Sequence, residues 1–152
     1  MDIFDEMKKE HKGFRKLISE IEETTERAVK TREKKFMELS TDLMAHHKAE
    51  EKVLVPVLKE HKETKIMGIE IEEEHHVADQ IVYELKDIPV DNDNWMVKFE
   101  VLKEIMDHHM QEEENEITKK GREVIEKDRL EKMVSKFEKE MEKRKDEMMA
   151  KA

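Results

Sequence analysis

The sequence contains no cysteine, and this absence limits the chemistry open to the protein. Without thiols there can be no disulfide, no thiolate ligand and no ordinary cysteine-held iron–sulfur cluster. Any bound metal ion must therefore be held by His, Asp and Glu side chains. Because the chain can form no disulfide, a cytoplasmic location is the default expectation.

Glycine, proline and aromatic residues are also scarce. The 152 residues include only 3 Gly and 2 Pro, and aromatic residues make up 5%. Because β-sheets favour β-branched and aromatic residues, this composition argues against a sheet protein. Charged residues reach 46%, which is typical of long helices rich in Glu and Lys. The length suits one domain with a single core.

The chain also lacks a long apolar run and an excess of positive charge. No segment has the roughly 18 consecutive apolar residues of a membrane span. The first residues, Met1 to Glu6, are acidic and do not resemble a signal peptide. The formal net charge of −10 disfavours binding to nucleic acid or to anionic membranes. We therefore expect neither of them as a partner.

What the chain does contain is a helical spacing of apolar residues, in steps of three and four. These stripes predict four long helices, approximately over residues 3–24, 31–62, 64–85 and 94–121. Pro56 should kink or end the second helix, because proline removes a hydrogen bond and clashes with the preceding turn.

Four long helices with short connections predict an all-α fold, an antiparallel up-and-down four-helix bundle. The segment Asp128-Arg129-Leu130-Glu131 resembles a capping box and predicts an additional C-terminal helix. We assign residues 1–125 to the bundle. Residues 126–152 form the added helix and a charged tail, packed on the bundle or extending from it.

Each of the four apolar stripes contains a histidine, and two contain a glutamate one helical turn later. Such residues lie on one side of a helix. These core positions are His11, His46, Glu50, His75, His109 and Glu113. A buried carboxylate is strongly disfavoured unless it is paired or ligates a metal. Nitrogen and oxygen ligands without sulfur suit iron, manganese or zinc, and carboxylates can bridge two ions. The stripes therefore predict a metal site.

Histidine occurs three times as a doublet. The doublets are His46-His47, His75-His76 and His108-His109. Neighbouring residues point about 100° apart on a helix, so only one of each pair can face the centre. Apolar spacing selects His46, His75 and His109. We expect the others, His47, His76 and His108, around the ligands or on the surface. Glu51 and Glu114 flank the site or orient ligands through hydrogen bonds.

These motifs resemble the hemerythrin family, in particular its HHE cation-binding domain. The resemblance covers roughly residues 1–125 and rests on His11, on His46-His47-Lys48-Ala49-Glu50-Glu51 running to Leu54 and Pro56, on Glu74-His75-His76, and on His109 through Ile117. It implies a non-haem di-iron site with two iron ions, as Fe2+ or Fe3+, joined by an oxo or hydroxo bridge. The implied terminal ligands are His11, His46, His75 and His109, and the implied bridging carboxylates are Glu50 and Glu113.

One departure from the family pattern bears on the ligand set. In the oxygen-carrying members the third helix supplies two histidines one turn apart, whereas Asp79 follows His75 at that spacing here. His76 or another doublet member then serves as the fifth histidine ligand, or one coordination position of the second iron is open or filled by water. Asp79 is itself a possible additional ligand.

The resemblance implies a protein that binds dioxygen for storage, delivery or sensing, and so a binding protein rather than an enzyme. Several alternatives stay open. One is a di-iron enzyme that reduces oxygen, peroxide or nitric oxide with a reductase partner. Another is an iron-binding or sensing protein with a signalling partner. A ferritin-like protein uses ExxH on two helices, which Glu72 and His75 match but the two main motifs do not. The last is a structural bundle without metal.

Overall fold

The computed structural model describes residues 1–151, with side chains up to residue 150, and every regular element in that range is a helix. In chain order these are α1 (Ile3–Glu22), α2 (Val29–Val53), α3 (Val55–Lys59), α4 (Lys65–Lys86), α5 (Asp93–Glu112), the π-helical turn η1 (Glu113–Ile117), α6 (Thr118–Val124) and α7 (Lys127–Lys151).

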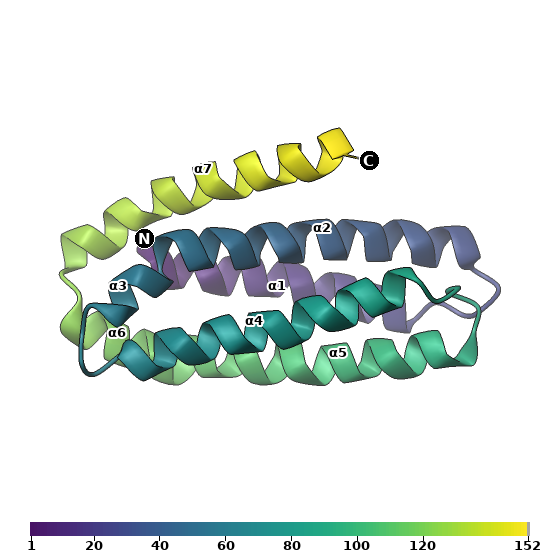
Figure 1. Ribbon diagram of the computed structural model, residues 1–152, viewed down its shortest axis with the longest axis horizontal. Coiled ribbons are helices and arrows are strands. Elements are labelled where there is room, and N and C mark those ends of the chain that lie inside the picture. The colour runs from purple at the N-terminus through teal and green to yellow at the C-terminus, as the bar shows by residue number, and fades with distance from the viewer. Residues whose placement is uncertain (152) are drawn as a thin grey trace.

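The four long helices α1, α2, α4 and α5 run alternately in opposite directions, side by side (Figure 1). This arrangement confirms the predicted up-and-down bundle. A capping box starts the first helix: Asp2 accepts a hydrogen bond from the Asp5 N–H, and the Asp5 side chain accepts one from the Asp2 N–H. Helix α1 therefore begins at Ile3, the start that the sequence predicted.

The break near Pro56 is also confirmed. Helix α2 ends at Val53, and the short helix α3 begins at Val55 with the proline in its first turn. Proline is tolerated there because the first N–H groups of a helix have no partner inside it. The chain then turns into α4, against which α3 packs.

The fourth bundle helix contains a π turn that the sequence analysis did not predict. The Thr118 N–H reaches back to the Glu113 carbonyl, and the Thr118 hydroxyl donates to the same oxygen over 2.5 Å. The sequence carries a signal for it, since His109, Glu113, Ile117 and Gly121 are spaced by four. In a regular α-helix each such step drifts about 40° off the face. The wider turn keeps all four positions buried.

The apolar core is divided into two clusters, with a polar layer between them. One cluster includes Trp95 and Phe99, near the α1–α2 and α4–α5 connections. The other includes Ile3 and Leu54, together with Phe137 of α7. Helix α7 packs along α2 and α1 (Figure 1), so it extends this second cluster on the outside of the bundle.

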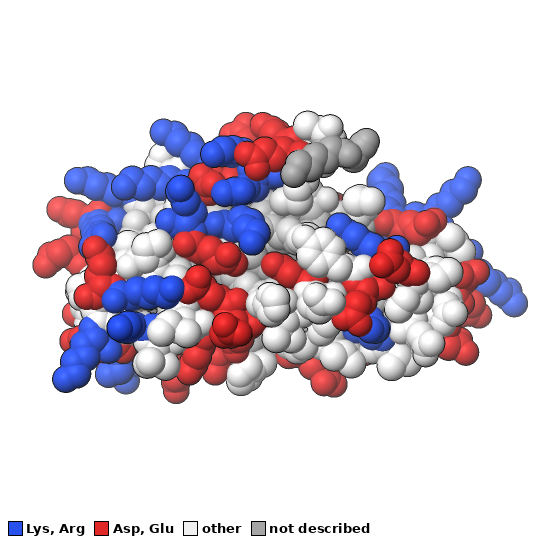
Figure 2. Space-filling model, viewed as in Figure 1, with Lys and Arg blue, Asp and Glu red and all other residues white. Residues whose placement is uncertain are grey.

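The surface is highly charged. Figure 2 shows basic and acidic side chains interspersed over one face of the molecule, with uncharged residues between them. Among the residues that the structure describes, no helix is both long and apolar enough to cross a membrane.

Candidate metal centre

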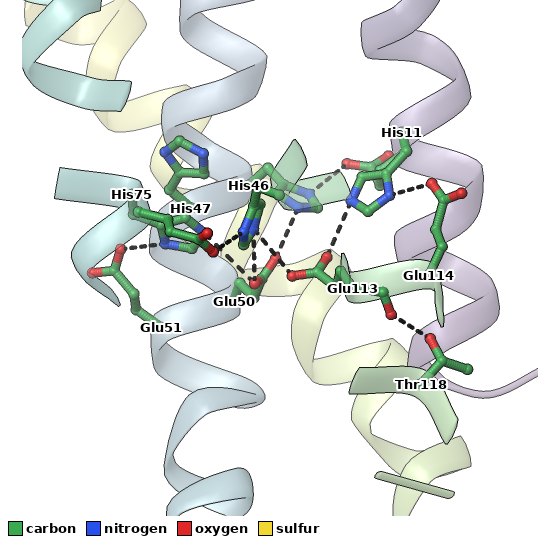
Figure 3. A network of polar contacts seen from close by, with 12 residues as sticks. His11, His46, His47, Glu50, Glu51, His75, Glu113, Glu114 and Thr118 are labelled. Atoms are coloured by element: carbon green, nitrogen blue, oxygen red, sulfur yellow. Dashed lines mark hydrogen bonds and ion pairs between the residues drawn. The ribbon is translucent and has the colours of Figure 1, made fainter. Parts of the chain in front are cut away.

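Six polar side chains from the four bundle helices meet in the layer between the two apolar clusters, and Figure 3 labels all of them except His109. They are His11 on α1, His46 and Glu50 on α2, His75 on α4, His109 on α5 and Glu113 at the start of η1. All are buried, with exposed fractions from 0% for Glu50 to 7% for His109. The structure thus brings together all six positions that the helical spacing selected as main ligands.

The donor atoms of these residues form two groups of three. One group is His11, His46 and Glu113, and the other is Glu50, His75 and His109. Within each group, one donor atom per residue lies within 4.8 Å of the others. Each group offers two imidazole nitrogens and one carboxylate oxygen, a donor set that suits iron, manganese or zinc.

The two glutamates connect the groups. Glu113 Oε1 lies 3.1 Å from His11 Nε2, and its Oε2 lies 3.2 Å from His109 Nε2. Glu50 Oε2 lies 3.0 Å from His46 Nε2, and its Oε1 lies 3.8 Å from His109 Nε2. Each carboxylate therefore presents one oxygen to each group.

Although these atoms are close, they do not complete hydrogen bonds with one another. Within the described chain, the Nε2 atoms of the four histidines and both oxygens of Glu50 and Glu113 are buried without a hydrogen-bond partner. Buried polar atoms are almost always bonded, and each unsatisfied group costs about 1–3 kcal/mol. Donors that converge on a common space rather than on each other fit a metal ion.

A carboxylate on a different helix lies behind each of the four imidazoles. The pairs are His11 Nδ1 with Glu114 at 2.7 Å, His75 Nδ1 with Glu51 at 2.8 Å, His109 Nδ1 with Glu74 at 2.7 Å and His46 Nδ1 with Glu10 at 3.7 Å. A carboxylate accepts, so in the three short pairs Nδ1–H donates and Nε2 is the nitrogen that faces the centre. Metal-ligating histidines are commonly oriented in this way.

Two of these outer carboxylates were expected and two were not. Glu51 and Glu114 were predicted as possible hydrogen-bond partners of ligands, which is confirmed. Glu10 and Glu74 were missed because each contacts a histidine on another helix, and spacing within one helix does not reveal such pairs. The available signal was their position directly before His11 and His75, which places an acid at the edge of the buried stripe.

The carboxylates give the centre a potential that favours positive charge. Burial by itself lowers the pKa of His46, but Glu10 and Glu50 outweigh burial and raise this pKa to about 9. Burial also opposes protonation of His109, yet Glu113 holds the pKa of that imidazole well above its usual value. A metal ion that binds here must displace these protons, because it needs the neutral imidazole.

The second member of the α2 doublet, His47, is buried rather than on the surface, with 2% of its area exposed. Its Nδ1 lies 2.7 Å from Asp79 Oδ1, and its ring stacks on that of His75 with centroids 3.9 Å apart. Burial and the neighbouring His75 hold the pKa of His47 well below its usual value. Burial raises the pKa of Asp79 to about 6.

The remaining doublet members lie away from the centre. His76 and His108 are exposed, and His108 Nε2 contacts Glu112 at 3.2 Å and Glu74 at 3.9 Å. His108, Glu74 and Glu112 form a third group with metal-ligand spacing, at the surface. The apolar spacing thus distinguished inner from outer histidines correctly in the third and fourth bundle helices.

A cavity of about 20 Å³ lies against the histidines. Besides His11, His46, His47, His75 and His109, it is lined by Glu74 and by Phe14, Leu43, Ala78, Ile105, Met106 and Met110. This volume is enough for a molecule about the size of water. Half of the lining residues are apolar, and the other half are the five histidines and Glu74.

Comparison with protein families gives one match. The model of the hemerythrin HHE cation-binding domain matches residues 2–120. This span contains all six buried ligand positions and ends inside α6, so α7 lies beyond it. The searches of curated proteins and of solved structures found no significant match.

Proposed function

The chain belongs to the hemerythrin family, as an HHE cation-binding domain, and we propose that its buried centre binds two iron ions and, with them, dioxygen for storage, delivery or sensing. The bound iron would supply the electrons that reversible oxygen binding requires. The protein then acts as a binding protein, with dioxygen or a similarly small molecule as its ligand.

The observation that carries the proposal is the sharing of two carboxylates between two donor groups. A single ion would need only one of these groups, whereas Glu50 and Glu113 each turn one oxygen toward each group. This supports two ions, with the glutamates as bridges and the histidines as terminal ligands.

The surrounding side chains orient the ligands and keep water out. Glu51, Glu74 and Glu114 accept hydrogen bonds from imidazoles and fix the ring orientations. Phe14 and Phe137 meet the His46 ring edge-on, with centroids 5.2 and 5.4 Å away. Apolar contact on two sides lowers the local polarity, which strengthens the hold of the carboxylates on a cation.

The size of the cavity supports a diatomic ligand or peroxide. A space of about 20 Å³ has no room for an organic substrate beside the histidines. Its polar lining residues are five histidines and Glu74, and four of these histidines are the proposed metal ligands. This favours oxygen binding over the chemistry of an enzyme with a separate substrate pocket.

The test is metal analysis followed by spectroscopy. The protein is loaded with Fe2+ without air, freed of excess metal and analysed for iron, and the expected result is two ions per chain. Its visible spectrum should change on admitting air and return when oxygen is removed. Sustained consumption of oxygen, peroxide or nitric oxide with a reductant would instead show that the protein is an enzyme.

Substitution of the shared carboxylates tests the centre itself. Glu50→Ala and Glu113→Ala should each lose one or both ions while the far-ultraviolet circular dichroism stays helical. The exposed Glu116→Ala serves as the matched control, since it lies in the same π turn as Glu113. Wild-type iron content in both carboxylate variants would reject the assignment.

A further inference from the structure

We propose that a basic groove beside α7 is the docking surface for a small acidic electron-carrier protein, which reduces the iron of the centre. The groove lies where the first half of α7 passes the end of α2 and the short helix α3 (Figure 1). This inference rests on the proposed function, because it concerns the iron-loaded centre, and it adds the class of partner that keeps that centre reduced.

The groove gathers positive charge in a chain whose formal net charge is −10. Arg129 pairs with Glu60 at 2.8 Å, and the one acid of the lining, Glu140, pairs with Arg144 at 3.1 Å. Among the side chains that the structure describes, the four lysines of the lining form no ion pair. The five cations around the basic groove are Lys52, Arg129, Lys132, Lys136 and Lys139. Positive charge that the protein does not neutralise itself attracts and orients an anionic partner.

The spacing of these cations on α7 costs helix stability. Arg129, Lys132, Lys136 and Lys139 recur in steps of three and four, so they are neighbours along one face of the helix. Like charges at these spacings destabilise a helix, whereas alternating Glu and Lys would stabilise it and serve solubility equally well. The basic stripe therefore favours a binding surface over a merely soluble one.

Between the cations the groove has an apolar floor. Val53, Val57 and Met133 are buried beneath it, and Pro56 is exposed in its wall. The groove encloses about 500 Å³, which is room for several side chains. A free anion such as phosphate would leave this floor uncovered, whereas a protein surface covers it with an apolar side chain and sets carboxylates against the lysines. An apolar centre with a charged rim is typical of protein interfaces, and electron-transfer complexes use small ones.

The floor of the groove lies close to the candidate metal centre. Met133 stands one helical turn before Phe137, whose ring meets that of His46 with centroids 5.4 Å apart. Val53 stands three residues after Glu50 on α2, a distance of about 4.5 Å along the helix axis. Two short paths, one through packed rings and one along α2, thus lead from the groove to ligands of the centre.

The size of the cavity at the centre explains why electrons should enter from the surface. Reversible oxygen binding needs Fe2+, and iron that air has oxidised to Fe3+ must be reduced again. The cavity of about 20 Å³ has no room for a flavin or a nicotinamide beside the histidines. A docked flavin or iron–sulfur protein supplies the electrons instead. Each Fe3+ accepts one electron and the carrier loses one, so two ions take two electrons and no covalent bond changes.

The experiment uses flavodoxin, a small acidic flavin protein, as the carrier. The groove variant is Lys132→Glu with Lys136→Glu, and the matched control is Lys30→Glu with Lys34→Glu. The control changes the net charge equally, at exposed positions near the other end of α2. Calorimetry measures flavodoxin binding to the full chain, both stripped of metal and loaded with iron. Stopped-flow absorbance without air measures the reduction of the Fe3+-loaded chain by reduced flavodoxin, after iron content and visible spectrum have shown each centre to be intact.

We expect the groove variant to bind flavodoxin at least about tenfold more weakly than the wild type and to be reduced more slowly by a similar factor. The control should stay within about twofold of the wild type on both measures. Added salt should weaken binding to the wild type and to the control, because it screens the charges. Binding should not need iron, since the groove contains no metal ligand.

Four outcomes would overturn the proposal. Equal binding of flavodoxin by the groove variant and the control would show that the groove is not the docking surface. Weaker binding with an unchanged rate of reduction would show that electrons enter elsewhere. Sedimentation of the chain alone, or with phosphatidylserine vesicles, would assign the groove to a second copy or to a membrane if association occurs and is lost in the groove variant. If the wild type takes up no iron, the proposed function fails and electron transfer with it, while binding to the stripped chain still tests the groove separately.

Discussion

Removal of the metal from the centre should lower the melting temperature of the protein by more than 10 °C. With iron bound, the converging nitrogen and oxygen atoms have a common partner. Without it, the same atoms stay buried, and in the described chain they have no hydrogen-bond partner. Removing the metal therefore destabilises the folded state, in which these atoms lose their partner. The unfolded chain is not affected, because there the same groups are exposed to water with or without metal.

The magnitude follows from the number of groups. The six buried side chains of the centre all carry unpartnered atoms, and each unsatisfied group costs about 1–3 kcal/mol. We use the low end because Glu50 and His46 still attract each other at 3.0 Å, which gives about 6 kcal/mol. In a chain of this size 1 kcal/mol moves the melting temperature by about 2–4 °C, so the expected difference is about 12–24 °C.

The assay is thermal unfolding followed by circular dichroism, on protein loaded with Fe2+ and on protein stripped with a chelator. The double variant Glu50→Gln with Glu113→Gln is the control, and its melting temperature should not depend on iron. Equal melting temperatures for the loaded and stripped wild type would refute the reasoning. Trapped water would then satisfy the six groups, or no metal would bind there.

Three further substitutions test the surroundings of the centre. Glu114→Gln should weaken iron binding by about 10- to 100-fold in chelator competition, because the charge behind His11 is lost, while Glu116→Gln should not. Phe137→Ala should lower the free energy of unfolding by about 3–5 kcal/mol in urea, since its ring is fully buried; a loss below 1 kcal/mol would show that α7 does not hold this position. Gly121→Ala would drive a methyl group into the Phe4 ring and should cost about 1–3 kcal/mol in the same assay, and an unchanged midpoint would contradict that contact.

The ligands could be predicted because the information is local. A histidine and a glutamate four residues apart take the place of apolar residues in a stripe, and the stripe itself gives the buried face. The rule that a buried carboxylate needs a partner then points to a metal. The same spacing predicted the bundle, since the direction of each helix follows from the short connections.

What the sequence did not reveal depends on contacts between helices. Glu10 and Glu74 act on imidazoles of neighbouring helices, and Phe137 reaches His46 from α7 across the outside of the bundle. His47 is one position off the apolar stripe of α2, so its burial depends on how closely α4 approaches. Spacing within one helix carries no information on that approach.

In both His-to-Glu motifs, the helix becomes irregular at the glutamate or within one turn after it. Helix α2 breaks at Leu54, four residues after Glu50, and the fourth bundle helix widens into a π turn that begins at Glu113. Both helices run in the same direction (Figure 1), so both irregularities lie at the same end of the centre. Departures of this kind cost hydrogen bonds or packing, and π turns are frequent at functional sites. Spacing thus selects both histidines and both glutamates, and Pro56 marks the break after Glu50, whereas the π turn at Glu113 is a change of backbone geometry that the analysis of apolar stripes did not predict.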